Sequence, residues 1–280
     1  MSDAKLPLCQ ELTPRLTWSD LCFPERVREQ LMDIPNMWKA RTVVHAQWGI
    51  AKRLKSSGMT ILFAGPSGTG KTETASVIAG SLGLRPLLVN TSALLSKYIG
   101  ETEHNIASLL DAAQRSASSV ALIFDECDTL FAKRIEQVRG SGDVAHNSHV
   151  GVLLSRLERF DGLAVLTTNA YEAIDRAFRR RFLLVVRFPE PTTEIRRQVW
   201  HTVMKDVPAR EDIDFERLAK LELSPGAIQN AFVRAAYVSA ARGLTQIDGA
   251  VLLTCANDEL EKEGKLISSP RPALAAKRRA

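Results

Sequence analysis

The 280-residue sequence lacks the marks of disulfide-rich, zinc-binding and membrane-spanning proteins. It has only four cysteines, and no two of them stand in the Cys-x-x-Cys spacing of a zinc site or in a disulfide framework. It also has no run of about 18 apolar residues and no secretory signal pattern. We therefore expect a cytoplasmic protein with no membrane span.

The chain has little excess charge outside its C-terminal end. Of the formal net charge of +5, four positive charges lie in the last ten residues, at Arg271, Lys277, Arg278 and Arg279, and the remainder carries +1. Residues 265–280 read as a basic, disordered tail. This distribution argues against a nucleic-acid-binding protein.

A glycine-rich run is the most informative segment that is present. It follows the apolar strand pattern of residues 59–64 and precedes a helical pattern over 73–82. Strand, glycine loop and helix are the context of a phosphate-binding loop. Its members are Gly65, Pro66, Ser67, Gly68, Thr69, Gly70, Lys71 and Thr72. A plain turn is the alternative, but every fixed position of the motif is filled, which favours ATP, with Lys71 on its outer phosphates and Thr72 on Mg²⁺.

Two carboxylates, Asp125 and Glu126, end a second apolar run that begins at Val120. Such a run predicts a buried strand whose carboxyl end opens toward the phosphate site. Asp125 would then hold Mg²⁺ and Glu126 would polarise the attacking water. By themselves the two acids could equally cap a following helix.

Alternating patterns predict an α/β fold, a P-loop NTPase with a five-stranded parallel sheet between helices and a C-terminal helical lid. The predicted strands are 59–64, 86–90, 120–125, 163–168 and 183–188. Helical patterns follow at 192–205, 214–222, 225–242 and 246–263.

The predicted domains follow from this alternation. Residues 1–58 are expected to form an irregular N-terminal segment with one or two linker helices, including 43–55, and Trp38 and Trp48 are expected to pack these helices. Residues 59–190 form the α/β domain, 191–264 the helical domain and 265–280 the tail.

Two further segments follow the glycine loop and the two acids along the chain, and they carry polar residues at specific positions. Asn169 ends the fourth predicted strand, and three consecutive arginines, Arg179, Arg180 and Arg181, precede Phe182. Together with the loop and the acids, they make residues 40–242 resemble the AAA+ superfamily, specifically the AAA clade of protein-remodelling ATPases. The resemblance implies that Asn169 holds the attacking water with Glu126. Asn169 could otherwise be a helix cap.

The resemblance also implies that Arg180 and Arg181 reach across a subunit boundary to a neighbour's ATP. The contiguous form resembles that of the meiotic, microtubule-severing subgroup, and it leaves Arg179 open as a finger. Fingers that act in trans imply a homo-oligomeric ring, commonly of six subunits.

The segment Lys97, Tyr98, Ile99 and Gly100 matches the family's first pore loop, which grips an extended polypeptide. From sequence alone, ordinary packing is the alternative for Tyr98 and Ile99. Gly226 and Ala227 match the family's sensor 2 segment and would approach the nucleotide, although Gln229 stands where many relatives carry arginine.

These features predict an ATP-hydrolysing ring motor that remodels a protein substrate, directly or through an adaptor. Two other readings stay open: a nucleic-acid-associated ATPase such as a loader or transposition regulator, and an assembly clamp that does not thread its substrate.

Overall fold

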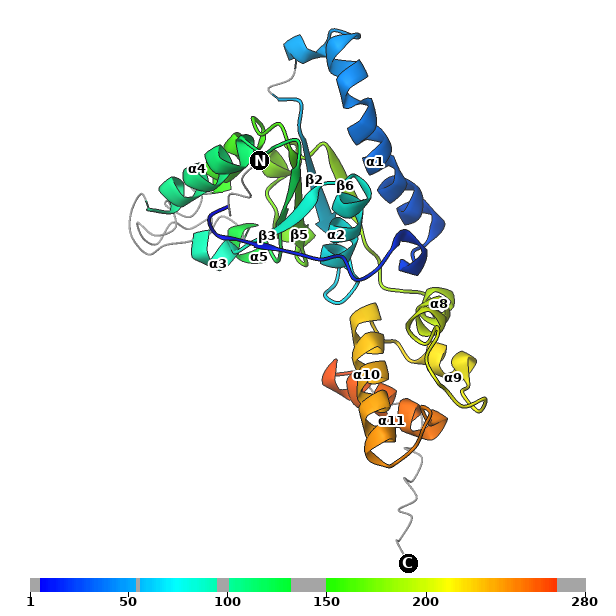
Figure 1. The fold of residues 1–280 in the computed structure, drawn as a ribbon. Helices are drawn as coiled ribbons and strands as arrows, with labels where there is room; N and C mark the ends of the chain where they lie inside the picture. Colours follow the sequence, from blue (N-terminus) through cyan, green and yellow to red (C-terminus); the bar gives the residue numbers. More distant parts are fainter. Residues whose placement is uncertain (1–5, 54–55, 95–100, 132–149, 266–280) are drawn as a thin grey trace, which may run out of the picture. The chain divides into compact units, whose positions relative to one another are not determined.

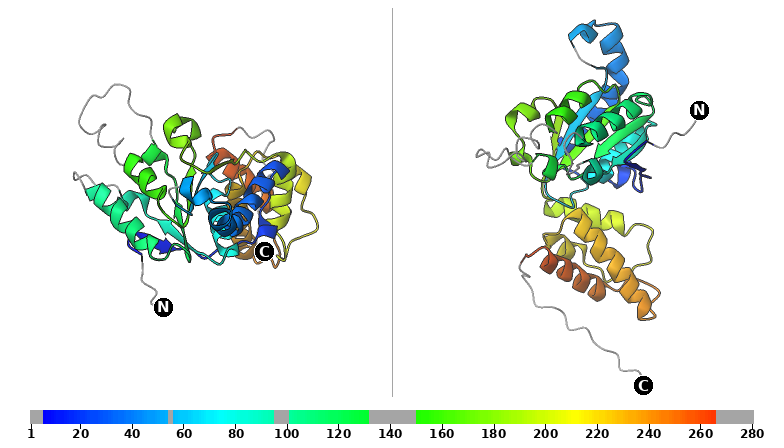
Figure 2. Two further views of the ribbon diagram at one scale, coloured as in Figure 1. Left: turned by 90° about the horizontal axis from the view of Figure 1, so that it is seen from above. Right: turned by 90° about the vertical axis from the view of Figure 1, so that its left-hand side faces the viewer.

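The computed structural model describes residues 6–53, 56–94, 101–131 and 150–265, and six strands within them form one sheet. The sheet order is β1-β3-β4-β5-β2-β6. The strands are β1 (Cys9–Glu11), β2 (Met59–Ala64), β3 (Arg85–Val89), β4 (Val120–Phe124), β5 (Leu163–Thr168) and β6 (Leu184–Arg187). β2 to β6 are parallel, whereas β1 pairs antiparallel with β3 at the edge (Figures 1 and 2).

Helices cover both faces of this sheet (Figure 1). α1 (Glu25–Ala46) and α2 (Lys71–Ser81) lie on one side, and α4 (Glu101–Gln114) lies on the other with the helical residues 150–157. The central strands are buried on both faces, as expected of parallel strands under helices. Alternate residues such as Leu122 and Phe124 belong to the core under α4.

Short elements connect these layers. They are the 3-10 turns η1 (Trp18–Asp20), η2 (Ile50–Arg53) and η3 (Tyr171–Ala173), and the helices α3 (Thr91–Leu94), α5 (Asp128–Phe131) and α7 (Arg176–Arg179).

The chain divides into two units, and the second has a hydrophobic core of its own. The second unit contains Pro189 onward together with Trp18–Pro24 and Ser67–Gly70. Its helices are α8 (Thr193–Val203), α9 (Phe215–Lys220), α10 (Pro225–Ala241) and α11 (Gly249–Lys262), with α10 and α11 packed against each other (Figure 2). Each helix begins at a side-chain N-cap: Thr192, Asp214, Ser224 and Asp248.

The prediction of an α/β P-loop fold followed by a helical region is confirmed, but the number of strands was wrong. All five predicted parallel strands are present, and β1 adds a sixth. Its three residues are held by tertiary pairing with β3 rather than by an apolar pattern of their own. The predicted domain boundaries stay predictions.

The helix predicted at 43–55 was also wrong. α1 begins at Glu25 and ends at Ala46, where Gly49 with φ +67° breaks the path before η2. Trp38 is buried in α1 as predicted, whereas Trp48 is 68% exposed and packs in no core.

Among the residues that the structure describes, no helix is both long and apolar enough to cross a membrane.

Candidate active site

Lys71 begins α2 and binds three acceptors around the start of the glycine loop. Its Nζ donates to the carbonyl oxygens of Gly65 and Pro66 and to Oδ1 of Asn169, each at 2.8 Å. Only 7% of Lys71 is exposed. Desolvation lowers the pKa of Lys71, and the nearby Asp125, Asp128 and Glu126 oppose that shift. The ammonium group therefore links the carboxyl ends of β2 and β5.

Asp125 lies directly after β4 and accepts two hydroxyl hydrogen bonds. Its Oδ1 accepts from Thr72 at 2.5 Å and from Thr167 at 2.6 Å. A carboxylate beside a hydroxyl is the oxygen donor set that Mg²⁺ prefers. The described residues contain no group of three or more His, Cys, Asp and Glu placed to hold a metal ion. Proteins usually bind Mg²⁺ with one or two carboxylates together with substrate phosphates.

Glu126 is exposed and adopts an unusual backbone conformation. Its φ is +48°, and its N–H donates to Oγ1 of Thr167 at 3.0 Å. A non-glycine residue in this region is strained, and such strain is concentrated at functional sites. Glu126 and Asp125 line a hollow of about 720 Å³ with residues of β1 and β3. The structure thus leaves the Glu126 carboxylate open to a small molecule such as water.

Asp128 is a site residue that the sequence analysis missed. Its Oδ1 accepts from Thr168 Oγ1 and from the N–H groups of Asn169 and Ala170, and its Oδ2 accepts from Asn169 Nδ2. Burial alone would raise its pKa, but these hydrogen bonds outweigh burial and hold the pKa of Asp128 below its ordinary value.

The contacts of Asp128 fix the side-chain amide of Asn169. Because Nδ2 is bound by Asp128, Oδ1 of Asn169 faces Lys71. The only sequence signal for Asp128 was an acid in the first turn after the Asp125-Glu126 pair.

The glycine loop has a backbone that other residues would not tolerate. Gly65 has φ +156°, and a Cβ there would lie 2.1 Å from the carbonyl oxygen of Phe188. Gly68 and Gly70 have φ of +74° and +87°. This cradle, the Lys71 ammonium and the oxygen donors of Thr72 and Asp125 fit ATP with Mg²⁺.

The predicted sensor 2 residues lie at the start of α10 in the second unit. Within that unit, the N–H of Gly226 donates to the carbonyl oxygen of Gly68 at 2.9 Å. Ser224 Oγ accepts from the N–H of Ala227 at 3.2 Å, whereas Gln229 is exposed. Within the second unit, Gly226 therefore lies beside Gly68.

The arginine segment is residues 176–181, and its last two arginines, Arg180 and Arg181, lie at the opposite edge of the sheet from Lys71. Leu183, just after the arginines, donates its N–H to Thr60 at the amino end of β2. Arg180 and Arg181 line a hollow of about 610 Å³ there, together with Met59 and residues of α1. Arg181 pairs with Glu158 at 3.4 Å, and the side chain of Arg180 makes no hydrogen bond or ion pair with the described residues.

Arg179 makes more contacts within its own chain than Arg180 or Arg181 does. It contacts Glu172, Ile174 and the ring of Tyr171. The predicted pore residues Lys97, Tyr98, Ile99 and Gly100 lie outside the described residues.

Residues 61–190 match the sequence model of the "ATPase family associated with various cellular activities (AAA)". The matched range includes every described site residue from the glycine loop to the arginine segment.

Three curated relatives show this similarity. Protein SAV of Sulfolobus acidocaldarius is 28% identical over 74% of this chain and 26% of its own length. The cell division cycle protein 48 homolog of Archaeoglobus fulgidus is 33% identical over 58% and 22%. The proteasome-activating nucleotidase of Saccharolobus solfataricus is 27% identical over 91% and 65%. The chain thus spans from 22% to 65% of the length of these relatives.

Proposed function

Because residues 61–190 match the AAA family of ATPases, we propose that the chain hydrolyses ATP in an oligomeric ring in which each chain completes its neighbour's site. ATP with Mg²⁺ would lie at the carboxyl edge of the sheet and supply the phosphoryl group and the metal's charge. The catalytic site would then consist of the residues that meet around Lys71 in one chain and of Arg180 and Arg181 from the next.

The chain's own residues have separate tasks in this proposal. Lys71 exchanges its carbonyl acceptors for the outer phosphates, and Thr72 and Asp125 hold Mg²⁺. Glu126 accepts a proton from the attacking water as general base. Asp128 keeps the Asn169 amide oriented so that it positions that water beside Glu126.

The position of the arginines carries the argument for a shared site. β2 has six residues between the arginine segment and the glycine loop, so its ends lie about 16 Å apart. Arg180 and Arg181 cannot bridge that distance to the phosphates of their own chain. A head-to-tail neighbour could bring its carboxyl edge to them, and a closed ring follows from repeating that contact. Six subunits are the number we propose.

The substrate proposed is a protein. The relatives' names include a proteasome-activating nucleotidase and a cell division cycle protein 48 homolog. We propose that Lys97, Tyr98, Ile99 and Gly100 grip that protein in the ring's pore, and that an adaptor or the basic tail recruits it. The cytoplasmic location expected from the sequence stays a prediction.

The shared site is tested by mixing two inactive variants. Arg180→Ala/Arg181→Ala keeps its own pocket but offers no guanidinium groups, and we expect phosphate release to fall about a hundredfold or more. Glu126→Gln keeps its arginines but cannot activate water. A mixture of both should release more phosphate than the sum of the separate samples, because a Glu126→Gln neighbour completes the intact pocket.

Two controls accompany the mixture. Arg176→Ala removes an exposed arginine of the same segment and should leave the rate unchanged. Wild-type specific activity should rise with protein concentration as rings assemble. A rate per chain that is constant at every dilution and insensitive to Arg180→Ala/Arg181→Ala would refute the shared site.

A further inference from the structure

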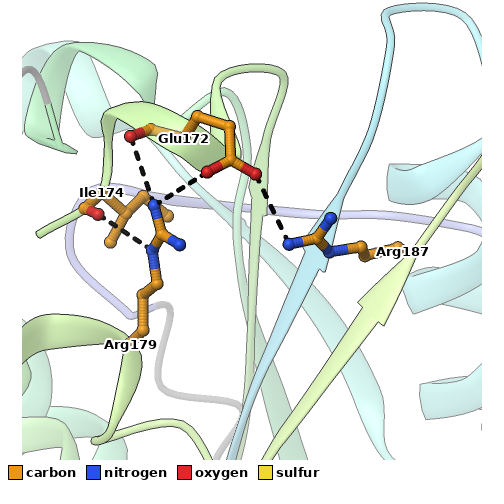
Figure 3. A network of polar contacts seen from close by, with 4 residues as sticks. All are labelled: Glu172, Ile174, Arg179 and Arg187. Carbon is orange, nitrogen blue, oxygen red and sulfur yellow. Dashed lines mark hydrogen bonds and ion pairs between the residues drawn. The ribbon is translucent and has the colours of Figure 1, made fainter. Parts of the chain in front are cut away.

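Tyr171 and Glu172 hold two arginines from different parts of the chain. The guanidinium carbons of Arg179 and Arg187 lie 4.2 Å and 4.1 Å from the centroid of the Tyr171 ring. The Glu172 carboxylate accepts from Arg179 at 3.3 Å and from Arg187 at 3.5 Å (Figure 3). We name these four residues the arginine clamp.

Arg179 is the most heavily bound member of the arginine clamp. Its Nε donates to the carbonyl oxygen of Ile174 at 2.9 Å, and its Nη2 donates to the carbonyl oxygen of Glu172 at 3.2 Å (Figure 3). Its side chain is only 26% exposed. A guanidinium group with this many acceptors in its own chain is poorly placed to reach into a neighbour.

The arginine clamp connects the two halves of the proposed shared site. Tyr171 stands two residues after Asn169, which accepts from Lys71. Arg179 stands directly before Arg180 in the sequence. Arg187 pairs in register with Ala64, the last residue before the glycine loop. The contacts therefore fix the arginine segment relative to strands that end at the phosphate site.

The arginine segment needs such an anchor because α7 has only four residues. A single helical turn has little stability of its own. Its start is capped by Asp175, which accepts from the N–H of Ala177 at 2.7 Å. Its end has Arg179, whose side chain crosses back to Glu172 and Ile174 (Figure 3).

Global stability is a poor explanation for these contacts. The side chains of Glu172 and Arg187 are 78% and 65% exposed, and ion pairs between exposed groups contribute little to folding. The stacking of Arg179 and Arg187 over the Tyr171 ring restricts the rotamers of both arginines, and it therefore fixes the direction in which their side chains point.

We propose that Tyr171 and Glu172 are positioning residues for the arginine finger: they retain Arg179 in its own chain so that Arg180 and Arg181 face the neighbouring subunit. This inference rests on the shared site proposed above. It assigns Arg179 a role as an anchor and leaves two arginines to act in trans. Loosening the clamp should therefore impair the neighbour's pocket and spare the chain's own.

The test is the variant Tyr171→Leu/Glu172→Gln, assayed alone and mixed with Glu126→Gln. Alone, we expect kcat to fall about tenfold, since a misplacement of about 1 Å can cost about a hundredfold in rate. Affinity for a fluorescent ATP analogue should stay unchanged, because the Lys71 pocket is intact. In the mixture, Glu126→Gln chains supply well-placed arginines, so phosphate release should exceed the sum of the separate samples.

The single variant Tyr171→Phe keeps the ring under both guanidinium groups, so its kcat should equal that of the wild type. Arg180→Ala/Arg181→Ala in the same mixture separates the two proposals. If that variant recovers with Glu126→Gln but the clamp variant does not, the clamp acts inside its own pocket and the inference is wrong. Wild-type kcat in the clamp variant would also overturn it. If neither variant recovers, the shared site itself fails.

Discussion

The charged side chains at the two edges of the sheet differ in how many hydrogen bonds and ion pairs they make within the chain. At the carboxyl edge, each charged side chain is hydrogen-bonded within the chain. Lys71 donates to a backbone carbonyl oxygen, Asp125 accepts from a threonine hydroxyl, and Asp128 accepts from the side-chain amide of Asn169. At the amino edge, the side chain of Arg180 has no hydrogen bond or ion pair with the described residues, and Arg181 has one ion pair with Glu158.

This difference distinguishes residues whose bonds shape the pocket from residues whose side chains are available to another molecule. A buried polar group must be satisfied internally, because leaving it unpaired costs about 1–3 kcal/mol. An exposed arginine has water as its partner and keeps its donors available for another molecule. This contrast supports the proposal that the carboxyl edge is one half of a shared site and that the amino edge is its complement.

The largest effect that would break the comparison comes from Glu126→Gln. The amide cannot accept the proton of water, so we expect kcat to fall about a hundredfold to ten-thousandfold. ATP binding, measured by titration calorimetry, should persist because Lys71 and Thr72 are unchanged. Glu211→Gln, an exposed acid of the second unit, is the matched control. Substantial turnover by Glu126→Gln would exclude its role as general base.

A middle effect is expected from Asp128→Asn, which removes the charged acceptor that orients Asn169. We expect kcat to fall about tenfold through misplacement of the attacking water. Steady-state kinetics should show this loss with little change in KM.

The same variant has a signature in pH. Because the folded-state pKa of Asp128 lies below its ordinary value of 3.8, its carboxylate stabilises the fold above that value, and the contribution is lost as pH falls through the folded-state pKa. Denaturant unfolding should show wild type and Asp128→Asn converging as the pH is lowered from 6 into this range. A stability difference that grows on acidification would contradict the hydrogen-bond assignment.

The smallest expected effect is on the free energy of unfolding, and it tests the arginines at the amino edge. Arg180→Ala and Arg181→Ala should each change the free energy of unfolding by about 1 kcal/mol or less, because both side chains are exposed. Urea titration measures this directly. A loss well above that value would mean that the arginines serve the fold, and their availability to a neighbour would lose its support.

The sequence predicted the carboxyl edge well because its residues follow apolar runs that are strands under any tertiary arrangement. Met59–Ala64 and Val120–Phe124 have this property. The position of Asn169 followed in the same way. The AAA family assignment, first made from motifs, is confirmed for residues 61–190.

Other features depend on tertiary contacts and could not be predicted. β1 exists because Cys9–Glu11 finds a partner in β3. α1 continues through Pro35, which breaks most helical patterns, because its apolar side chains are buried. Asp128 carries no motif, and its role appears only when β5 brings Thr168 and Asn169 beside it. The bound state of Arg179 likewise depends on the fold of residues 171–174.

The pairing of β1 with β3 has a practical consequence for handling the protein. In the described sheet, Cys9–Glu11 occupies the outer hydrogen-bonding row of β3, from Leu87 to Val89. A chain shortened past Leu12 would leave that row bare, and a bare row can recruit a strand from another molecule. We therefore expect tags and truncations at this end to affect self-association of the protein more than the proposed ATP hydrolysis.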